Sequence, residues 1–95
     1  MSGASYYSPG EILRKQFMSP RGITIYRLAK DTCVPATRIS GILRGERKIN
    51  PETALRLSRY FGNPPEYWLG IQNRYDLAEE RRRLVDDLCR IKRLP

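Results

Sequence analysis

The stretch formed by residues 23–50 constrains the fold most, because it has the pattern of two short helices joined by a tight turn. Thr24 offers a hydroxyl cap to the first helix. The second helix should open at Val34 and Pro35, since proline suits a first turn, where its missing N–H would have no partner. Gly45 is a typical helix end. The facing sides of the two helices share apolar residues at helical spacing, namely Leu28, Ala29, Ile39, Ile42 and Leu43. The stretch therefore predicts a helix-turn-helix, whose second helix can enter the major groove of DNA.

Other helices begin with the same pattern, in which an N-cap residue is followed by proline and then by an acidic residue in the first turn. Residues 8–11 should form a capping box, and residues 50–52 should begin a further helix. Residues 19–22 should break the first helix, and residues 63–66 form a turn that starts the fifth. The helix after residue 50 should bury one face, made of Ala54, Leu55, Leu57 and Phe61.

These elements predict an all-α fold of five helices around one core, with a C-terminal helical tail. The 95 residues are enough for one small domain. We expect a flexible N-terminal arm at residues 1–8, a helix-turn-helix DNA-binding domain at residues 9–77 and the tail at residues 78–95. In the tail, an apolar stripe on a predicted helix consists of Leu84, Leu88 and Ile91.

The charge balance points to a polyanionic partner. Lys and Arg number 18 against 10 acidic residues, so the net charge is +8 and the pI is about 10.0. Such an excess favours nucleic acid or an acidic membrane surface, although ordinary solubilising charge is the alternative. The surplus lies over the helix-turn-helix and the part of the chain before it, because residues 63–95 carry seven basic and six acidic side chains.

Residue types exclude several kinds of site. There is no histidine, which rules out Ser-His and Cys-His nucleophile pairs and His-ligated metals. Cys33 and Cys89 form no CxxC motif, so two free thiols are expected, with a disulfide as the alternative. No apolar run reaches the ~20 residues of a membrane span, and the N-terminus lacks a signal-peptide pattern. We therefore expect a cytoplasmic protein that is not an enzyme and has no cofactor, metal or membrane partner.

Reading a DNA sequence requires side chains early on the second helix that reach base edges. By position, Ala36, Thr37 and Arg38 occupy the exposed start of that helix. Gly41 follows one turn later on the same face. Arg38 suits a bidentate contact with guanine, Thr37 a base or its phosphate, and Ala36 a thymine methyl group. Whether Arg38 reads a base or only holds a phosphate stays open. At the start of the first helix, Thr24 and Tyr26 can place a backbone amide or a phenol on a phosphate.

An ordered set of short motifs resembles a known family. Within the helix-turn-helix the motifs are Leu28-Ala29, Val34, Ile39-Ser40 and Arg44-Gly45-Glu46-Arg47. The flanking motifs are Pro9-Gly10-Glu11-Ile12-Leu13, Thr53-Ala54-Leu55-Arg56-Leu57, Tyr60-Phe61-Gly62, Pro65-Glu66-Tyr67-Trp68-Leu69, Gln72 and Tyr75-Asp76-Leu77. Over residues 9–77 this set resembles the HigA-type antitoxins, also called virulence-associated protein I, with a phage-repressor-like (XRE) motif.

The resemblance implies a function. It implies an antitoxin of a type II toxin–antitoxin system that binds double-stranded operator DNA as a homodimer. The antitoxin would neutralise a HigB-like, RelE-class ribonuclease toxin and repress its own operon. The resemblance also implies that the loop after the second helix clamps phosphates through Arg44, Arg47 and Lys48.

Two positions depart from the family pattern. Cys33 stands where the turn usually has glycine, which would cost on the order of 1 kcal/mol if the backbone there has a positive φ. Gly41 stands where the family often has a longer side chain. Its presence suggests fewer direct base contacts and more dependence on Arg38 and DNA shape.

One helix-turn-helix reads a half-site, so a dimer surface is expected. Two apolar stripes are candidates for dimer or toxin contact, and they consist of Tyr67, Ile71 and Tyr75 and of Leu84, Leu88 and Ile91. Acidic tail residues could meet a basic toxin or simply solvate the helix through pairs such as Glu79–Arg83. Trp68 is expected to be a core or interface anchor rather than a stacking platform for single-stranded nucleic acid.

Alternative functions stay open on sequence grounds. A solitary helix-turn-helix regulator without a toxin partner would differ only in the tail and the genomic neighbour. A module that binds RNA or an acidic protein would also show steep salt dependence, but it would not prefer one duplex sequence. A hydrolase that uses carboxylates is formally possible, although no motif places a pair.

Overall fold

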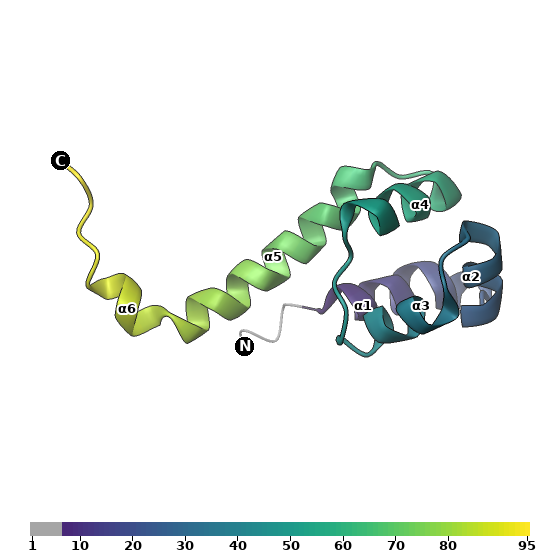
Figure 1. The fold of residues 1–95 in the computed structure, drawn as a ribbon, viewed down its shortest axis with the longest axis horizontal. Coiled ribbons are helices and arrows are strands. Elements are labelled where there is room, and N and C mark those ends of the chain that lie inside the picture. Colours follow the sequence, from purple (N-terminus) through teal and green to yellow (C-terminus); the bar gives the residue numbers. More distant parts are fainter. Residues whose placement is uncertain (1–6) are drawn as a thin grey trace.

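The computed structural model describes residues 7–95, which form helices and short turns with no strand among them (Figure 1). The all-α expectation of a five-helix domain with a helical tail is confirmed. The elements are α1 (Pro9–Ile12), a π-helical segment η2 (Leu13–Met18), a 3-10 turn η3 (Ser19–Arg21), α2 (Ile25–Thr32), α3 (Ala36–Leu43), α4 (Pro51–Phe61), α5 (Pro65–Arg83) and α6 (Val85–Cys89). The predicted arm lies outside the described residues, apart from Tyr7 and Ser8.

The first helix begins and ends where the sequence predicted. The Ser8 hydroxyl accepts a hydrogen bond from the Glu11 amide at 3.2 Å, and the Glu11 carboxylate accepts one from the Ser8 amide at 3.0 Å, so the capping box is present. The predicted break at residues 19–22 is confirmed, because the π-helical segment ends at Met18 and the short 3-10 turn that follows ends at Gly22. Pro20 lies in the first turn of η3, where no N–H is needed. The φ of Gly22, 65°, is left-handed.

The fourth helix has the predicted ends, but its buried face is different. Asn50 caps α4 by accepting from the Thr53 amide at 2.8 Å, and the helix ends at Gly62. The buried residues are Thr53, Ala54 and Leu57. Leu55 was predicted to be buried and is exposed instead, because α4 packs along positions 53, 54 and 57, and Leu55 lies on the other side of the helix.

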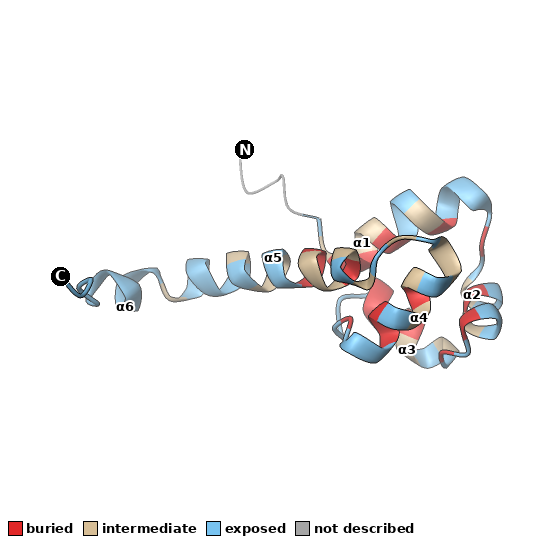
Figure 2. Cartoon of the chain, turned by 90° about the horizontal axis from the view of Figure 1, so that it is seen from above, coloured by how far each residue is buried: buried red, intermediate tan, exposed pale blue. Residues whose placement is uncertain are grey.

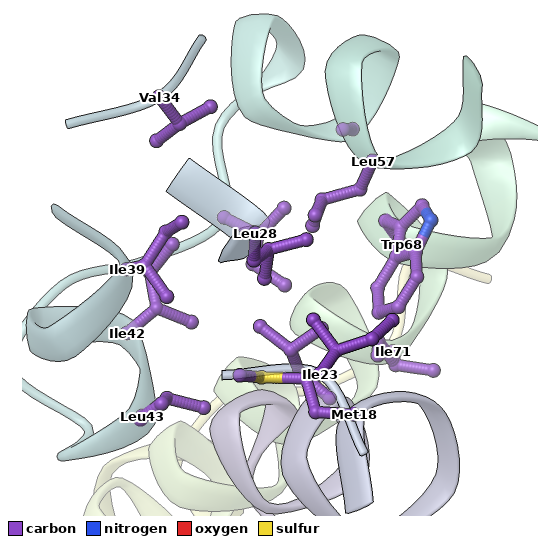
Figure 3. Close-up of a cluster of buried hydrophobic side chains, with 13 residues drawn as sticks. Met18, Ile23, Leu28, Val34, Ile39, Ile42, Leu43, Leu57, Trp68 and Ile71 are labelled. Atoms are coloured by element: carbon purple, nitrogen blue, oxygen red, sulfur yellow. The ribbon is translucent and has the colours of Figure 1, made fainter. Parts of the chain in front are cut away.

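The core gathers apolar side chains from η2, α2, α3, α4 and α5, and it includes Trp68, which is fully buried (Figure 3). The Trp68 ring centroid lies 4.7 Å from that of Phe17 and 6.0 Å from that of Phe61. Its indole nitrogen donates to the side-chain oxygen of Asn63 at 3.0 Å. Trp68 is thus the core anchor that the sequence predicted, since both its apolar ring and its donor are satisfied inside the domain.

Glycine allows α1 to lie directly on α3. A Cβ atom added to Gly10 would stand 2.1 Å from the carbonyl oxygen of Ile42 and 2.8 Å from the Cα of Leu43. These are backbone atoms of α3, which cannot rotate away as a flexible side chain can. The absence of a side chain at Gly10 therefore fixes the distance between α1 and the helix predicted to enter DNA.

The fifth helix leaves the domain as a long projection (Figure 1), and its outer part is mostly exposed (Figure 2). The predicted boundary between residues 77 and 78 falls inside this continuous helix. The chain bends at Leu84, and α6 follows. Ile91 was predicted to continue the helical stripe, but it lies beyond the end of α6 at Cys89. Among residues 7–95, no helix is long and apolar enough to cross a membrane.

Ion pairs on the projecting part of α5 differ from the predicted pair. One of the two alternatives for the acidic tail residues paired Glu79 with Arg83, four residues later. Instead Arg82 lies 2.8 Å from Glu79, and Arg83 lies 2.6 Å from Glu80. Both ion pairs are exposed and join residues three positions apart on α5. They therefore add little to the stability of the helix.

Candidate nucleic-acid interface

Helices α2 and α3 form the predicted helix-turn-helix, in which α3 is the recognition helix. Thr24 caps α2, with its hydroxyl accepting from the Arg27 amide at 3.1 Å. The turn passes through Cys33 in the left-handed conformation, at φ 59° and ψ 36°, and it is the sole non-glycine residue with positive φ among residues 7–95. The Val34 amide then donates to the Ala29 carbonyl at 3.2 Å. The turn therefore keeps the backbone that glycine would favour and carries the strain of a cysteine in its place.

The recognition helix begins at Ala36, later than the predicted opening at Val34 and Pro35. Pro35 is its N-cap, with an extended ψ of 140° that keeps it outside the helix. Its carbonyl accepts hydrogen bonds from the amides of Arg38, at 3.0 Å, and Ile39, at 3.2 Å. The fixed φ of proline still serves the helix, but from the capping position.

The first turn of the recognition helix faces the start of α2 across a shallow hollow. Thr37 is exposed and Ala36 half-buried, while Tyr26 at the start of α2 is largely exposed. Together with Ile25 and Ser40 they line a hollow of about 230 Å³. Ala36, Thr37 and Tyr26 thus present a mixed polar and apolar surface where the sequence placed contacts to bases and phosphate.

Arg38, the predicted base reader, points toward α4. Its Nη1 lies 3.4 Å from both the Glu52 carboxylate and the Thr53 hydroxyl, and its side chain is 21% exposed. Glu52 also holds Arg56 at 3.2 Å. Contacts of 3.4 Å are at the weak limit of hydrogen bonding. Arg38 is therefore held loosely by a carboxylate, and it must leave that contact before its guanidinium can reach a base.

Gly41 does not lie on the exposed face where the sequence placed it. It is buried beneath Arg47, and an added Cβ would lie 2.8 Å from the Arg47 Cγ and Cδ atoms. The amides of Glu46 and Arg47 both donate to the Gly41 carbonyl, at 2.8 and 3.2 Å. The chain after α3 thus turns back over Gly41, and the aliphatic part of Arg47 covers the position where the sequence placed a base contact.

The loop of residues 44–50, which we call the basic loop, follows the recognition helix. Arg44 donates to the Ser40 hydroxyl at 2.6 Å and to the Glu46 carboxylate at 3.0 Å. The hydrogen bond to Glu46 raises the pKa of Arg44, and the same bond lowers the pKa of Glu46. Arg47 and Lys48 are exposed. The three predicted phosphate contacts therefore lie together on one accessible loop beside the recognition helix.

Gln72 on α5, a residue outside the predicted site, binds the backbone of the basic loop. The Gln72 side chain on α5 is buried, and its oxygen accepts a hydrogen bond from the Ile49 amide at 2.8 Å. From the sequence, Gln72 was part of the family pattern and had no predicted role at the site. The available signal was a polar residue next to Ile71 and four residues after Trp68, on the buried face of a helix, where an amide requires a partner.

Comparison with known proteins identifies the family. Residues 13–68 match the family model described as Helix-turn-helix. Antitoxin HigA-1 of Vibrio cholerae is 36% identical over 87 residues, which cover 92% of this chain and 82% of that protein. The chain belongs to the HigA family of helix-turn-helix proteins.

Two further similarities agree with membership of the HigA family. Virulence-associated protein I of Dichelobacter nodosus is 44% identical over 80 residues, covering 82% of this chain and 74% of that protein. The solved structure of Pseudomonas aeruginosa antitoxin HigA with the higBA promoter has a TM-score of 0.89 at 32% identity, over 95% of this chain and 99% of that chain. The predicted resemblance is confirmed, and the chain is a DNA-binding helix-turn-helix protein rather than an enzyme.

The residues proposed for dimer or toxin contact fall into different environments in this HigA-family fold. Ile71 is 4% exposed and belongs to the core, so it offers no surface to a partner. Tyr67 and Tyr75 are half-buried, and the Tyr67 ring packs edge-on against Trp68 at 5.3 Å. Leu88 is exposed and Leu84 partly so. Apolar surface that a partner could cover is therefore found on the tail, and the face of Tyr67, Ile71 and Tyr75 is largely used by the domain itself.

Proposed function

We propose that the chain is an antitoxin that binds the operator of its own operon as a homodimer, represses that operon and neutralises a HigB/RelE-like ribonuclease toxin. It would act in the cytoplasm, where its DNA is found. The observation that carries the proposal is the exposed basic loop beside a recognition helix, within a fold that matches a HigA structure with promoter DNA.

In this proposal, the basic loop binds phosphates through Arg44, Arg47 and Lys48. Further phosphate contacts come from Tyr26 and from the backbone at the N-terminus of α2, next to Thr24, because amides there point outward. These contacts fix the register of the protein on the duplex, and they carry no sequence information by themselves.

Base reading falls to the first turn of the recognition helix. Thr37 is exposed and can donate to or accept from a base edge, and Ala36 can contact a thymine methyl group. Arg38 adds a contact with guanine or phosphate once its guanidinium has left the Glu52 carboxylate. Gly41 is left out, because Arg47 covers it.

A homodimer supplies two recognition helices to two half-sites, about 34 Å apart on one face of the duplex. Support for a dimer comes from α5 and α6, which project from the domain and expose Val85 and Leu88 beside the partly exposed Leu84. The same tail carries Asp86 and Asp87, which suit the basic surface expected of a ribonuclease toxin.

The first test measures binding to the duplex that lies directly upstream of the gene, against a scrambled duplex of equal composition. Tighter binding to the upstream duplex, with the mass of a dimer in solution, is expected. Equal binding to both duplexes would refute sequence-specific repression. Tagged protein isolated from its own cells should also bring down a small basic partner in stoichiometric amount. Recovery of the protein with DNA alone would instead favour a solitary regulator.

A further inference from the structure

Next to its last residue, the basic loop contains a buried residue whose backbone is held by another helix. The Ile49 side chain is in the core, so its amide lies inside the protein, away from water. The acceptor of that amide is the Gln72 side chain, 2.8 Å away and 23 residues later in the chain. A buried N–H without an acceptor would be strongly unfavourable, so this one bond sets where the loop can return to the domain.

The orientation of the Gln72 amide is itself fixed. Its nitrogen donates to one carboxylate oxygen of Asp76 at 3.1 Å, which leaves its oxygen facing Ile49. The other oxygen of Asp76 lies 3.2 Å from the Lys48 ammonium. A connected set of contacts therefore runs from the Ile49 amide through two residues of α5 to the side chain of Lys48, which is still 73% exposed and free to meet a phosphate on its outer side.

We propose that Gln72, oriented by Asp76, is a positioning residue for DNA binding. It holds the basic loop in the shape in which Arg47 and Lys48 reach phosphate. This inference rests on the proposed operator binding and adds a residue that touches no DNA. It also gives α5 a double role, because the helix that anchors the loop is the one that leaves the domain and carries the tail (Figure 1). A partner that tilts α5 would then change the DNA-binding loop through Gln72.

The decisive variant is Gln72→Met, which keeps the length of the side chain and the net charge but removes both hydrogen bonds. Because no charge changes, altered DNA affinity would report the shape of the loop. We expect binding to the upstream duplex to weaken on the order of tenfold. We also expect the slope of log affinity against log salt to fall by about 0.9 for each phosphate that the protein no longer neutralises. Asn73→Met is the matched control, because Asn73 is exposed on the same helix.

A rescue separates positioning from general stability. The double variant Gln72→Glu/Asp76→Asn keeps an acceptor for the Ile49 amide and a donor–acceptor pair between positions 72 and 76, so it should recover the wild-type salt slope. Amide hydrogen exchange gives a local readout. The Ile49 amide should be protected in the wild type and in the double variant, and it should exchange faster in Gln72→Met, while the core amide of Leu57 stays protected. If Gln72→Met does not fold, Gln72→Asn replaces it, since its shorter side chain leaves the Ile49 amide out of reach.

The outcomes distinguish this inference from the proposed function. Unchanged affinity and salt slope in Gln72→Met, with the wild type still preferring its own duplex, would overturn the positioning role alone. A wild type that prefers no duplex would refute the proposed function. If the wild type prefers no duplex, hydrogen exchange of the Ile49 amide still tests the inference. The same exchange rate in Gln72→Met as in the wild type would overturn the inference as well. Faster exchange in Gln72→Met would uphold the anchoring of the loop by Gln72.

Discussion

Replacing Gly10 by alanine tests how closely α1 packs on the recognition helix. The new methyl group would lie 2.1 Å from the Ile42 carbonyl oxygen, whereas ordinary contact begins at 3.4 Å, so the two helices must part by about 1.3 Å. The obstacle is backbone, and no rotamer change relieves it. Overpacking of a core costs about 1–3 kcal/mol, and we expect about 3 kcal/mol here because two whole helices must move.

The assay is thermal and urea unfolding followed by circular dichroism at one protein concentration, because dimerisation would make the midpoint depend on concentration. At about 4–8 °C per kcal/mol for a domain of this size, the melting temperature of Gly10→Ala should fall by more than about 10 °C. Gly70→Ala is the matched control. Gly70 lies within α5, and the nearest atom to its added methyl is the Arg74 Nη1 at 3.9 Å. This variant should gain about 0.5–1 kcal/mol from helix propensity.

The two variants make the reasoning refutable. Gly10→Ala and Gly70→Ala both replace a helical glycine by alanine, so both variants gain stability from helix propensity. The variants differ in that the new methyl group meets the α3 backbone only in Gly10→Ala. If Gly10→Ala were as stable as Gly70→Ala, the close packing of α1 on α3 would be refuted. A second expectation follows from the same displacement. Folded Gly10→Ala should bind its operator more weakly than Gly70→Ala, because α3 is displaced from its place beside the basic loop.

The remaining predictions concern the turn and the DNA contacts. Cys33→Gly should stabilise the protein by about 1 kcal/mol in the same unfolding assay, because it removes a side chain from a left-handed residue; a loss of stability would contradict the strain assigned to the turn. Arg38→Ala should weaken operator binding by about 1–3 kcal/mol and relax selectivity at one base position in a binding-site selection. Lys48→Ala should instead weaken binding to all duplexes alike and lower the salt slope by about 0.9. Unchanged isotherms for both Arg38→Ala and Lys48→Ala would refute the placement of the DNA surface.

The ends of the helices could be predicted from the sequence because the signals are local. Ser8, Thr24 and Asn50 each cap the helix that they precede, and each accepts a hydrogen bond from an amide three residues later. Such a contact depends on a few dihedral angles and not on the rest of the fold. Pro35 shows the precision of these signals, since it starts a helix as expected but from the capping position.

Burial was harder to predict, because it depends on which other parts of the chain pack against a given face of a helix. Leu55 and Leu57 are both apolar but lie on opposite sides of α4, and packing against the rest of the domain buries the side that carries Leu57. Ile71 was expected to face a partner, but its own domain covers it. Helical periodicity shows which residues share a face, whereas tertiary packing decides whether that face is inside.

The orientation of the predicted DNA contacts depends on the path of the basic loop. Its amides fold back onto the Gly41 carbonyl, and its end is drawn in by Gln72, so the loop is compact and brings the start of α4 beside the recognition helix. That proximity places Glu52 within 3.4 Å of Arg38. The Arg38 guanidinium is therefore paired with a carboxylate when no DNA is bound. If Arg38 contacts DNA as proposed, binding exchanges this weak, partly exposed ion pair for a contact with phosphate or guanine. The exchange would make the affinity contributed by Arg38 smaller than the strength of its contact with DNA.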